Sequence, residues 1–137
     1  MSADREKRIE AELKRLKEGG QVAEHFAGAT PRAVVIYRKV PCLLGEGYPT
    51  EMDVLVPVPD GYPAGHIDNA GLPTGNELFP RLAGGTNPQG TFSADGREWV
   101  IASYHPHQGS GGPPWDPTRH GFHTYFDHLV AWLSVLK

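Results

Sequence analysis

Apolar residues recur with helical spacing near the start of the chain. Strong helix formers fill residues 3–18. Within this stretch, Ile9, Leu13 and Leu16 fall at positions i, i+4 and i+7. The spacing predicts one helix with a narrow apolar stripe, which we expect to lie on the outside of a sheet. Gly19-Gly20 should end the helix, because paired glycines are costly inside a helix and allow a left-handed cap.

The most regular apolar pattern lies at the opposite end of the chain. It predicts a long C-terminal helix over residues 122–136, introduced by the segment 115–118. Its apolar positions fall at i, i+3, i+4, i+7, i+11 and i+14 and are Phe122, Tyr125, Phe126, Leu129, Leu133 and Leu136. We expect the aromatic residues of this region, including Trp115 and Trp132, to pack the helix against a sheet.

Between the two helices the apolar residues follow strand patterns. β-Branched and aromatic residues fill 33–37 and 53–58, which predicts two strands of an antiparallel hairpin. Shorter runs predict a third strand around 66–72 and a last strand at 97–104. The second strand should end at Pro57 or run along an edge there, because proline donates no hydrogen bond to a ladder.

Two stretches contain glycine and proline without periodicity. We expect residues 73–96 to form an irregular excursion, serving partner recognition or no role, with a turn at Asp95-Gly96 before the last strand. Residues 105–114 should form a surface loop, because prolines remove donors and glycines disfavour order. The order of helix, about four strands in an antiparallel meander, loop and helix predicts an α+β fold.

Length and charge narrow the classes of protein that fit this pattern. A chain of 137 residues is long enough for one compact domain and too short for two, so we expect a single domain over 1–137. A net charge of −3 gives no electrostatic grip on phosphate backbones, which argues against nucleic acid as a partner. The chain has no apolar run of the roughly 18 residues that a membrane span needs, and its start is charged, so we expect a cytoplasmic protein without a membrane partner.

Several short motifs follow one another in a distinctive order. Segment 56–63 is a proline-rich turn ending in Tyr62-Pro63, His105-Pro106-His107 follows the last strand, and Trp115-Asp116-Pro117 precedes the last helix. In this order they resemble the Tyr-Pro turn, the His-Pro-Asn motif and the Trp-x-Pro motif of the ubiquitin-conjugating (UBC) fold family. A bacterial branch of that family looks closer still, because its members end the last strand in Ser-x-His, as in Ser103-Tyr104-His105, before a tryptophan and one long helix.

The resemblance implies partners and also marks a departure. That bacterial branch occurs beside genes for activating enzymes, ubiquitin-like proteins and JAB-type peptidases, so the resemblance implies such partners here. A conventional member carries a cysteine just before the position of Trp115, and no cysteine follows Cys42. A thioester at the usual position is therefore excluded. Cys42 is the only cysteine, lies in the first hairpin, and allows neither an internal disulfide nor a cysteine-built zinc site.

The candidate catalytic residues are Ser103, His105 and His107. Ser103 and His105 are two positions apart at a strand end, so both side chains can lie on one side as a nucleophile and its base. Ser103 would then accept the C-terminus of a ubiquitin-like protein as an oxyester. Counting back from Trp115 favours His107 instead, as an acyl carrier or as the base for an incoming lysine. The alternative is that these residues have no catalytic role, and that Ser103 merely ends the strand beside solvated histidines.

Other interpretations of the same residues remain open. His105, His107, His120 and His123 could converge on a metal, but their spacing matches no standard zinc motif, and we expect neither metal nor cofactor. Three classes of function stay open: an acyl carrier, an inactive UBC-fold scaffold, and, as the rival that would need such a site, a metal or serine hydrolase. The first helix carries six basic residues, which form a solvated face or, by the resemblance, dock an activating enzyme: Arg5, Lys7, Arg8, Lys14, Arg15 and Lys17.

Overall fold

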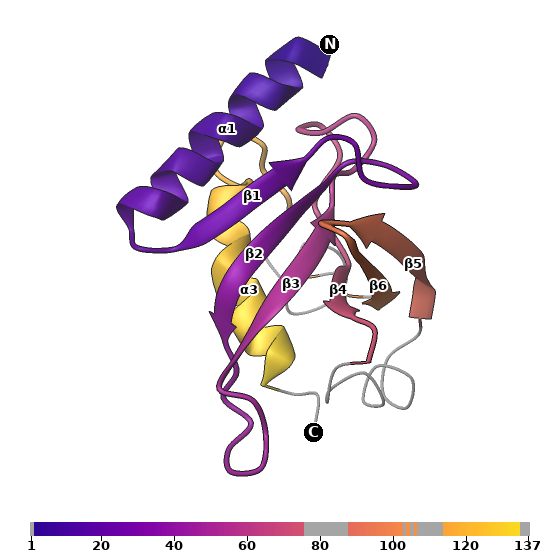
Figure 1. Cartoon of the computed structure of the whole chain (residues 1–137). Helices are drawn as coiled ribbons and strands as arrows, with labels where there is room; N and C mark the ends of the chain where they lie inside the picture. Colours follow the sequence, from indigo (N-terminus) through magenta and orange to yellow (C-terminus); the bar gives the residue numbers. More distant parts are fainter. Residues whose placement is uncertain (1, 76–87, 103, 105, 107–113, 135–137) are drawn as a thin grey trace.

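Two helices and a six-stranded antiparallel sheet make up the described part of the chain, an α+β arrangement (Figure 1). The computed structural model describes residues 2–75, 88–102, 104, 106 and 114–134. In space the strands follow the order β1-β2-β3-β4-β6-β5. The elements are α1 (Ser2–Glu18), β1 (Val22–Phe26), β2 (Val34–Pro41), β3 (Glu51–Pro57), β4 (Ala70–Pro73), β5 (Pro88–Ala94), β6 (Arg97–Ala102) and α3 (Phe122–Leu133).

The N-terminal helix and its glycine stop are confirmed. After α1, Gly20 has a left-handed backbone with a φ of 88°. The amide of Gly20 donates to the carbonyl of Lys17 at 3.0 Å, and the amide of Gln21 donates to that of Leu16 at 2.9 Å. This pair of bonds is the Schellman arrangement, which satisfies carbonyls that the helix end leaves open. The chain then turns directly into β1, which runs beside α1 (Figure 1).

The hairpin predicted from the apolar runs at residues 33–37 and 53–58 is confirmed as β2 and β3. Its antiparallel register pairs Val35 with Val56 and Tyr37 with Val54. Strand β3 ends at Pro57, as its missing donor predicts. It is not an edge strand, however, because β4 pairs with its other side through Leu55 and Gly71.

The expectation of about four strands is wrong, because β1 and β5 complete a sheet of six. Strand β1 lacks a clear apolar alternation, since Val22 is 51% exposed and charged or half-buried residues follow. Strand β5 lies inside the stretch expected to be irregular, where a register shift falls between Pro88 and Gly90. Pairing with the strongly patterned β6 forms this strand, through a turn in which Asp95 and Gly96 both have positive φ.

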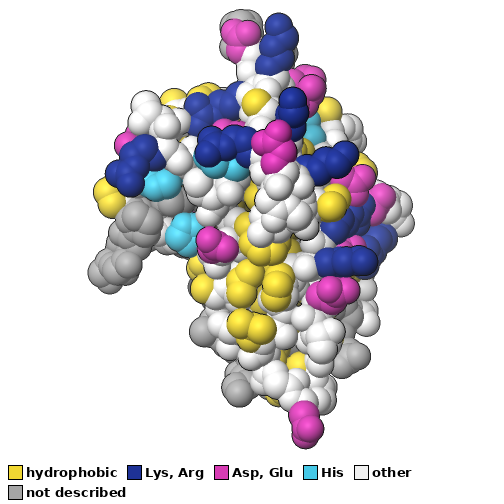
Figure 2. Space-filling view, turned by 90° about the vertical axis from the view of Figure 1, so that its left-hand side faces the viewer, with side chains coloured by type: hydrophobic (Ala, Val, Ile, Leu, Met, Phe, Trp, Pro, Cys, Tyr) yellow, Lys and Arg dark blue, Asp and Glu magenta, His cyan; other side chains and the backbone are white. Residues whose placement is uncertain are grey.

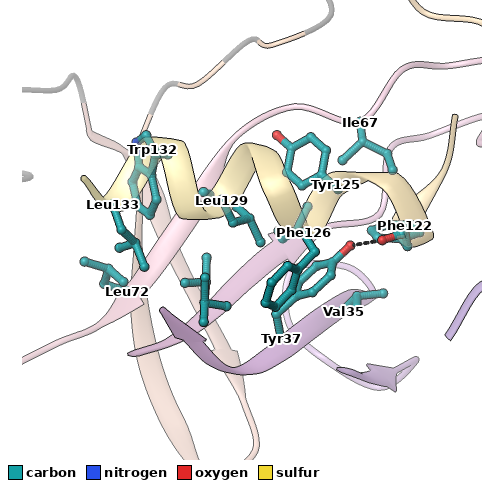
Figure 3. Packing of buried hydrophobic residues seen from close by; sticks show 14 of the residues in the cluster. Val35, Tyr37, Ile67, Leu72, Phe122, Tyr125, Phe126, Leu129, Trp132 and Leu133 are labelled. Atoms are coloured by element: carbon teal, nitrogen blue, oxygen red, sulfur yellow. Dashed lines mark hydrogen bonds between the residues drawn. The ribbon is translucent and has the colours of Figure 1, made fainter. Parts of the chain in front are cut away.

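The main core lies between α3 and one face of the sheet (Figure 3). Phe122, Tyr125, Leu129 and Leu133 are fully buried there, as the periodicity predicts. The Tyr37 hydroxyl on β2 donates to the carbonyl of Phe122 at 2.6 Å and so fixes the start of α3 against the sheet. The expected packing role of the helix aromatics is confirmed.

A second, smaller core fills the opposite face of the sheet. The sheet curls so that the β5–β6 hairpin packs against residues of β2 and β3, with Trp99 fully buried among Ile36, Leu55 and Phe92. The Trp99 indole donates to the carbonyl of Ala94 at 3.0 Å. Trp99 is therefore a core residue.

Candidate functional site

The three predicted catalytic residues, Ser103, His105 and His107, lie outside the described residues. The candidate site therefore consists of the described groups near that segment and near the start of α3. Within the described residues, no group of three or more His, Cys, Asp or Glu side chains could hold a metal ion. His120, one of the proposed ligands, instead accepts a hydrogen bond at Nδ1 from the Asp116 amide at 3.0 Å.

The chain leaving β6 is attached to the loop before β4. Tyr104 donates its amide to Asn69 Oδ1 at 3.3 Å, and its carbonyl accepts from the Asn69 amide at 2.5 Å. The Tyr104 hydroxyl donates to the carbonyl of His128 on α3 at 2.9 Å, and burial raises the pKa of this phenol. Asn69 has a left-handed φ of 67°, which asparagine tolerates better than most residues. These contacts fix the exit of β6 between the sheet and α3.

Two of the motifs that carry the resemblance are in direct contact. Trp115 donates its indole N–H to the carbonyl of Pro63 at 2.9 Å, across 52 positions of sequence. Its ring packs against that of Tyr62 with centroids 6.2 Å apart. Beyond Trp115, the Asp116 carboxylate accepts from the Thr118 amide and hydroxyl at 3.0 and 2.7 Å, which lowers the pKa of Asp116. The Tyr-Pro turn and the Trp-x-Pro segment thus form one structural unit.

A buried carboxylate, Glu12, connects this unit to both helices. Its Oε1 accepts from the Tyr62 hydroxyl at 2.6 Å and from the amide of Phe122 at 3.1 Å. Its Oε2 accepts from Arg8 Nε at 2.8 Å. Glu12 is only 5% exposed, and charge-assisted bonds of this kind are stronger than neutral ones. The carboxylate from α1 therefore satisfies a free amide at the start of α3.

Sequence reasoning missed Glu12, although a signal was present. Glu12 lies three positions after Ile9 and four before Leu16, which places a carboxylate on the apolar stripe of α1. A charged residue at such a position is buried only when it is paired. Its neighbour Arg8 donates Nη2 to the carbonyls of Pro117 and His120 at 2.6 and 3.0 Å. Arg8 is thus a structural residue, in contrast to the expected solvated basic face.

Gly121 leaves the space that the carboxylate occupies. A Cβ at Gly121 would collide with the Glu12 carboxylate and lie 2.8 Å from the Tyr62 hydroxyl. Burial, followed by the hydrogen bond to Glu12, raises the pKa of Tyr62 well above its ordinary value, so this hydroxyl stays a donor. The chemistry of the cluster is structural, because the donors and acceptors of Glu12, Tyr62 and Arg8 are engaged with one another and with the backbone.

An open pocket of about 520 Å³ lies beside this cluster, between α1 and the segment before α3. Arg8, Glu12, Arg15, Arg119 and His123 are its charged and titratable lining residues. Burial, and then the nearby charge of Arg15, lower the pKa of His123. Figure 2 shows Lys and Arg side chains, with His, Asp and Glu side chains among them, on the upper part of the face that it draws. The pocket combines cationic groups with room for a small ligand.

Cys42 lies where the sequence predicts it, in the connection between β2 and β3. Its side chain is 5% exposed and belongs to the main core. A buried thiol in apolar surroundings is a poor nucleophile. Cys42 is therefore a packing residue.

Compared with protein-family models, with curated proteins and with solved structures, the chain matches none of them. Among the helices of the described residues, neither is long and apolar enough to cross a membrane.

Proposed function

We propose that this chain is a ubiquitin-conjugating-like protein of a bacterial ubiquitin-like modification pathway. In this role it accepts or presents the C-terminus of a ubiquitin-like protein delivered by an activating enzyme. Because the only thiol, Cys42, is buried in the core, the transfer would use a non-cysteine acyl carrier.

The observation that carries the proposal is the contact between motifs far apart in sequence. Tyr62-Pro63 and Trp115 each belong to a motif that resembles one of the UBC family. They meet through the hydrogen bond from the Trp115 indole to the Pro63 carbonyl at 2.9 Å. The α+β order, with a helix at each end of an antiparallel sheet, adds support. The contact between Asn69 and Tyr104 supports it further, because it holds the residue between Ser103 and His105.

The proposed chemistry is acyl transfer at the end of β6. Ser103 Oγ would attack the activated C-terminal carbonyl of the modifier while His105 takes the hydroxyl proton. The bond to the activating enzyme's thiolate breaks, and that leaving group takes up the proton. The resulting oxyester on Ser103 would then be open to attack by an amine. His107 is the alternative acyl carrier or base.

Intact-mass analysis tests the proposal directly. The chain is incubated with ATP, its cognate activating enzyme and the ubiquitin-like protein, and the wild type is compared with Ser103→Ala, His105→Ala and His107→Ala. Ser93→Ala is the matched control, since Ser93 is an exposed serine on β5. We expect a modifier adduct that resists thiol reductants, is released by hydroxylamine, and is lost in one of the three variants but kept in the control.

A different result would overturn the catalytic part of the proposal. If the chain binds the activating enzyme and the modifier but never gains the mass of the modifier, it is a scaffold that presents the modifier. If it binds neither partner, the assignment to this pathway fails.

A further inference from the structure

The pocket between α1 and the segment before α3 has an excess of positive charge. Three arginines line it, Arg8, Arg15 and Arg119, against one carboxylate, Glu12. His123 completes the charged and titratable lining. With a volume of about 520 Å³, the pocket lies in the size range of small-ligand sites.

Glu12 offsets only one of the three guanidinium groups. Its Oε2 is bound to Arg8 Nε at 2.8 Å, and its Oε1 accepts from Tyr62 and from the amide of Phe122. Arg8 in turn is held by two backbone carbonyls. The Arg8–Glu12 pair is therefore close to neutral and adds little net charge to the pocket.

The other two arginines are exposed. Neither Arg15 nor Arg119 forms an ion pair with a carboxylate of the described residues. Arg119 lies near Asp116 and helps to lower its pKa, but the Asp116 oxygen Oδ1 is engaged with the amide and hydroxyl of Thr118. The two guanidinium groups thus keep donors available for a ligand.

His123 also lines the pocket. His123 Nδ1 is buried and makes no hydrogen bond with any described residue. It lies 3.9 Å from Glu12 Oε2, too far for a hydrogen bond. Arg15 and His123 line the same pocket, and the charge of Arg15 contributes to the lowered pKa of His123. Because this nitrogen is enclosed, His123 serves as a reporter of the pocket and not as a contact of the ligand.

We propose that this pocket binds a tetrahedral dianion of the phosphate type, with Arg15 and Arg119 as its charged contacts. Two guanidinium groups match the charge of a dianion, and their planar forks fit pairs of phosphate oxygens. A singly charged carboxylate would leave one arginine uncompensated. This inference rests on the pocket alone and holds whether or not the chain carries a modifier.

An NMR titration with inorganic phosphate at low ionic strength tests the site, with the His123 imidazole and the amides of residues 118–123 as reporters. We expect saturable shifts in these residues. Arg15→Gln and Arg119→Gln should each weaken binding by roughly tenfold or more, the effect of losing one charged hydrogen bond. Both side chains are exposed, so the variants should fold, and thermal unfolding of each checks this.

The controls separate a site from general attraction between charges. Lys17→Gln removes one charge from the same helix at a residue that lines a different hollow, beside β1, and should change the affinity less than twofold. Sulfate should compete with phosphate, whereas acetate should bind more weakly. Three results would overturn the proposal: shifts that do not saturate, an equal loss in Lys17→Gln, or acetate binding as tightly as phosphate.

Discussion

At the scale of single residues, Glu12 is the group on which most contacts at the helix junction depend. Its carboxylate binds a tyrosine hydroxyl, a guanidinium and a backbone amide from three separate parts of the chain. Removing such a carboxylate destabilises the fold mainly because the buried donors that it accepted from are left without a hydrogen-bond partner.

Replacing Glu12 by glutamine should therefore destabilise the fold. Glu12→Gln keeps the shape of the side chain but removes the charge that Arg8 and the Phe122 amide face. We expect the free energy of unfolding to fall by about 2–4 kcal/mol, measured by urea denaturation. Glu10→Gln, an exposed glutamate on the same helix, should stay within about 0.5 kcal/mol of the wild type. Equal losses in the two variants would show that Glu12 is not a special position.

Gly121 should tolerate no side chain, for reasons of space. Its φ of −177° is open to any residue, but a Cβ would collide with the Glu12 carboxylate. We expect Gly121→Ala to lower the free energy of unfolding by about 1–3 kcal/mol, the cost of overpacking a well-filled site. Gly28→Ala is the control, because no atom of the described residues lies within 4 Å of a Cβ built there. A Gly121→Ala variant as stable as the control would contradict the tight packing at this junction.

The histidine at the pocket should make stability depend on pH. Burial and Arg15 lower the pKa of His123 below its ordinary 6.5. Between the pKa of His123 in the folded chain and its ordinary pKa of 6.5 in the unfolded chain, the unfolded chain binds more protons. The stability due to neutral His123 is therefore complete above pH 6.5 and is lost as the pH falls. We expect the free energy of unfolding to decline as the pH falls from about 6.5 to about 5, measured by urea denaturation at each pH.

His123→Gln should flatten part of that pH dependence. The slope should not vanish, because burial also lowers the pKa of His25 and of His128. A variant whose unfolding free energy declines as steeply as that of the wild type would show that His123 is not responsible.

At the scale of elements, the end of α1 shows how much of a helix stop can be predicted from the local sequence. Two adjacent glycines end the helix, but only Gly20 has a positive φ. The sequence therefore predicts the stop, whereas the structure tells which glycine the backbone needs.

This difference predicts unequal effects of the same substitution at neighbouring positions. Gly20→Ala should cost about 1 kcal/mol, because alanine is strained at a φ of 88°. Gly19→Ala should be neutral or slightly stabilising, since its Cβ would meet only ordinary contacts of 3.5 Å or more. Thermal unfolding of both variants measures the difference. Equal melting temperatures would rule out the assigned cap.

At the scale of the whole molecule, a charge network on the sheet ties together strands that are distant in sequence. Arg38 on β2 bonds Glu24 on β1 at 2.6 Å, Asp53 on β3 at 3.1 Å and Asp95 in the β5–β6 turn at 2.9 Å. One guanidinium thus bridges strands near both edges of the curled sheet. Its removal would leave three carboxylates facing one another.

We expect Arg38→Met to lower the free energy of unfolding by about 1–2 kcal/mol, because several charged hydrogen bonds are lost together. The loss should shrink in high salt, which screens repulsion among the remaining carboxylates. Arg97→Met is the matched control, since Arg97 contacts Asp53 at 3.4 Å and is more exposed, and it should cost less. A larger loss in Arg97→Met would contradict the central place of Arg38.

Patterns that repeat along the chain were determined by the sequence itself. The stripe of α1, its glycine stop, the β2–β3 hairpin, the Asp95-Gly96 turn and the buried face of α3 were all predicted, because each depends on neighbours within a few residues.

Only the tertiary structure decided the features that depend on contacts between distant segments. β1 and β5 form because β2 and β6 offer them partners, although neither has a clear pattern of its own. Glu12 is buried because Tyr62, Arg8 and the start of α3 converge on it, and the cationic pocket exists because two segments about 100 positions apart meet. Such contacts are set by the packing of the whole chain, which no local spacing records.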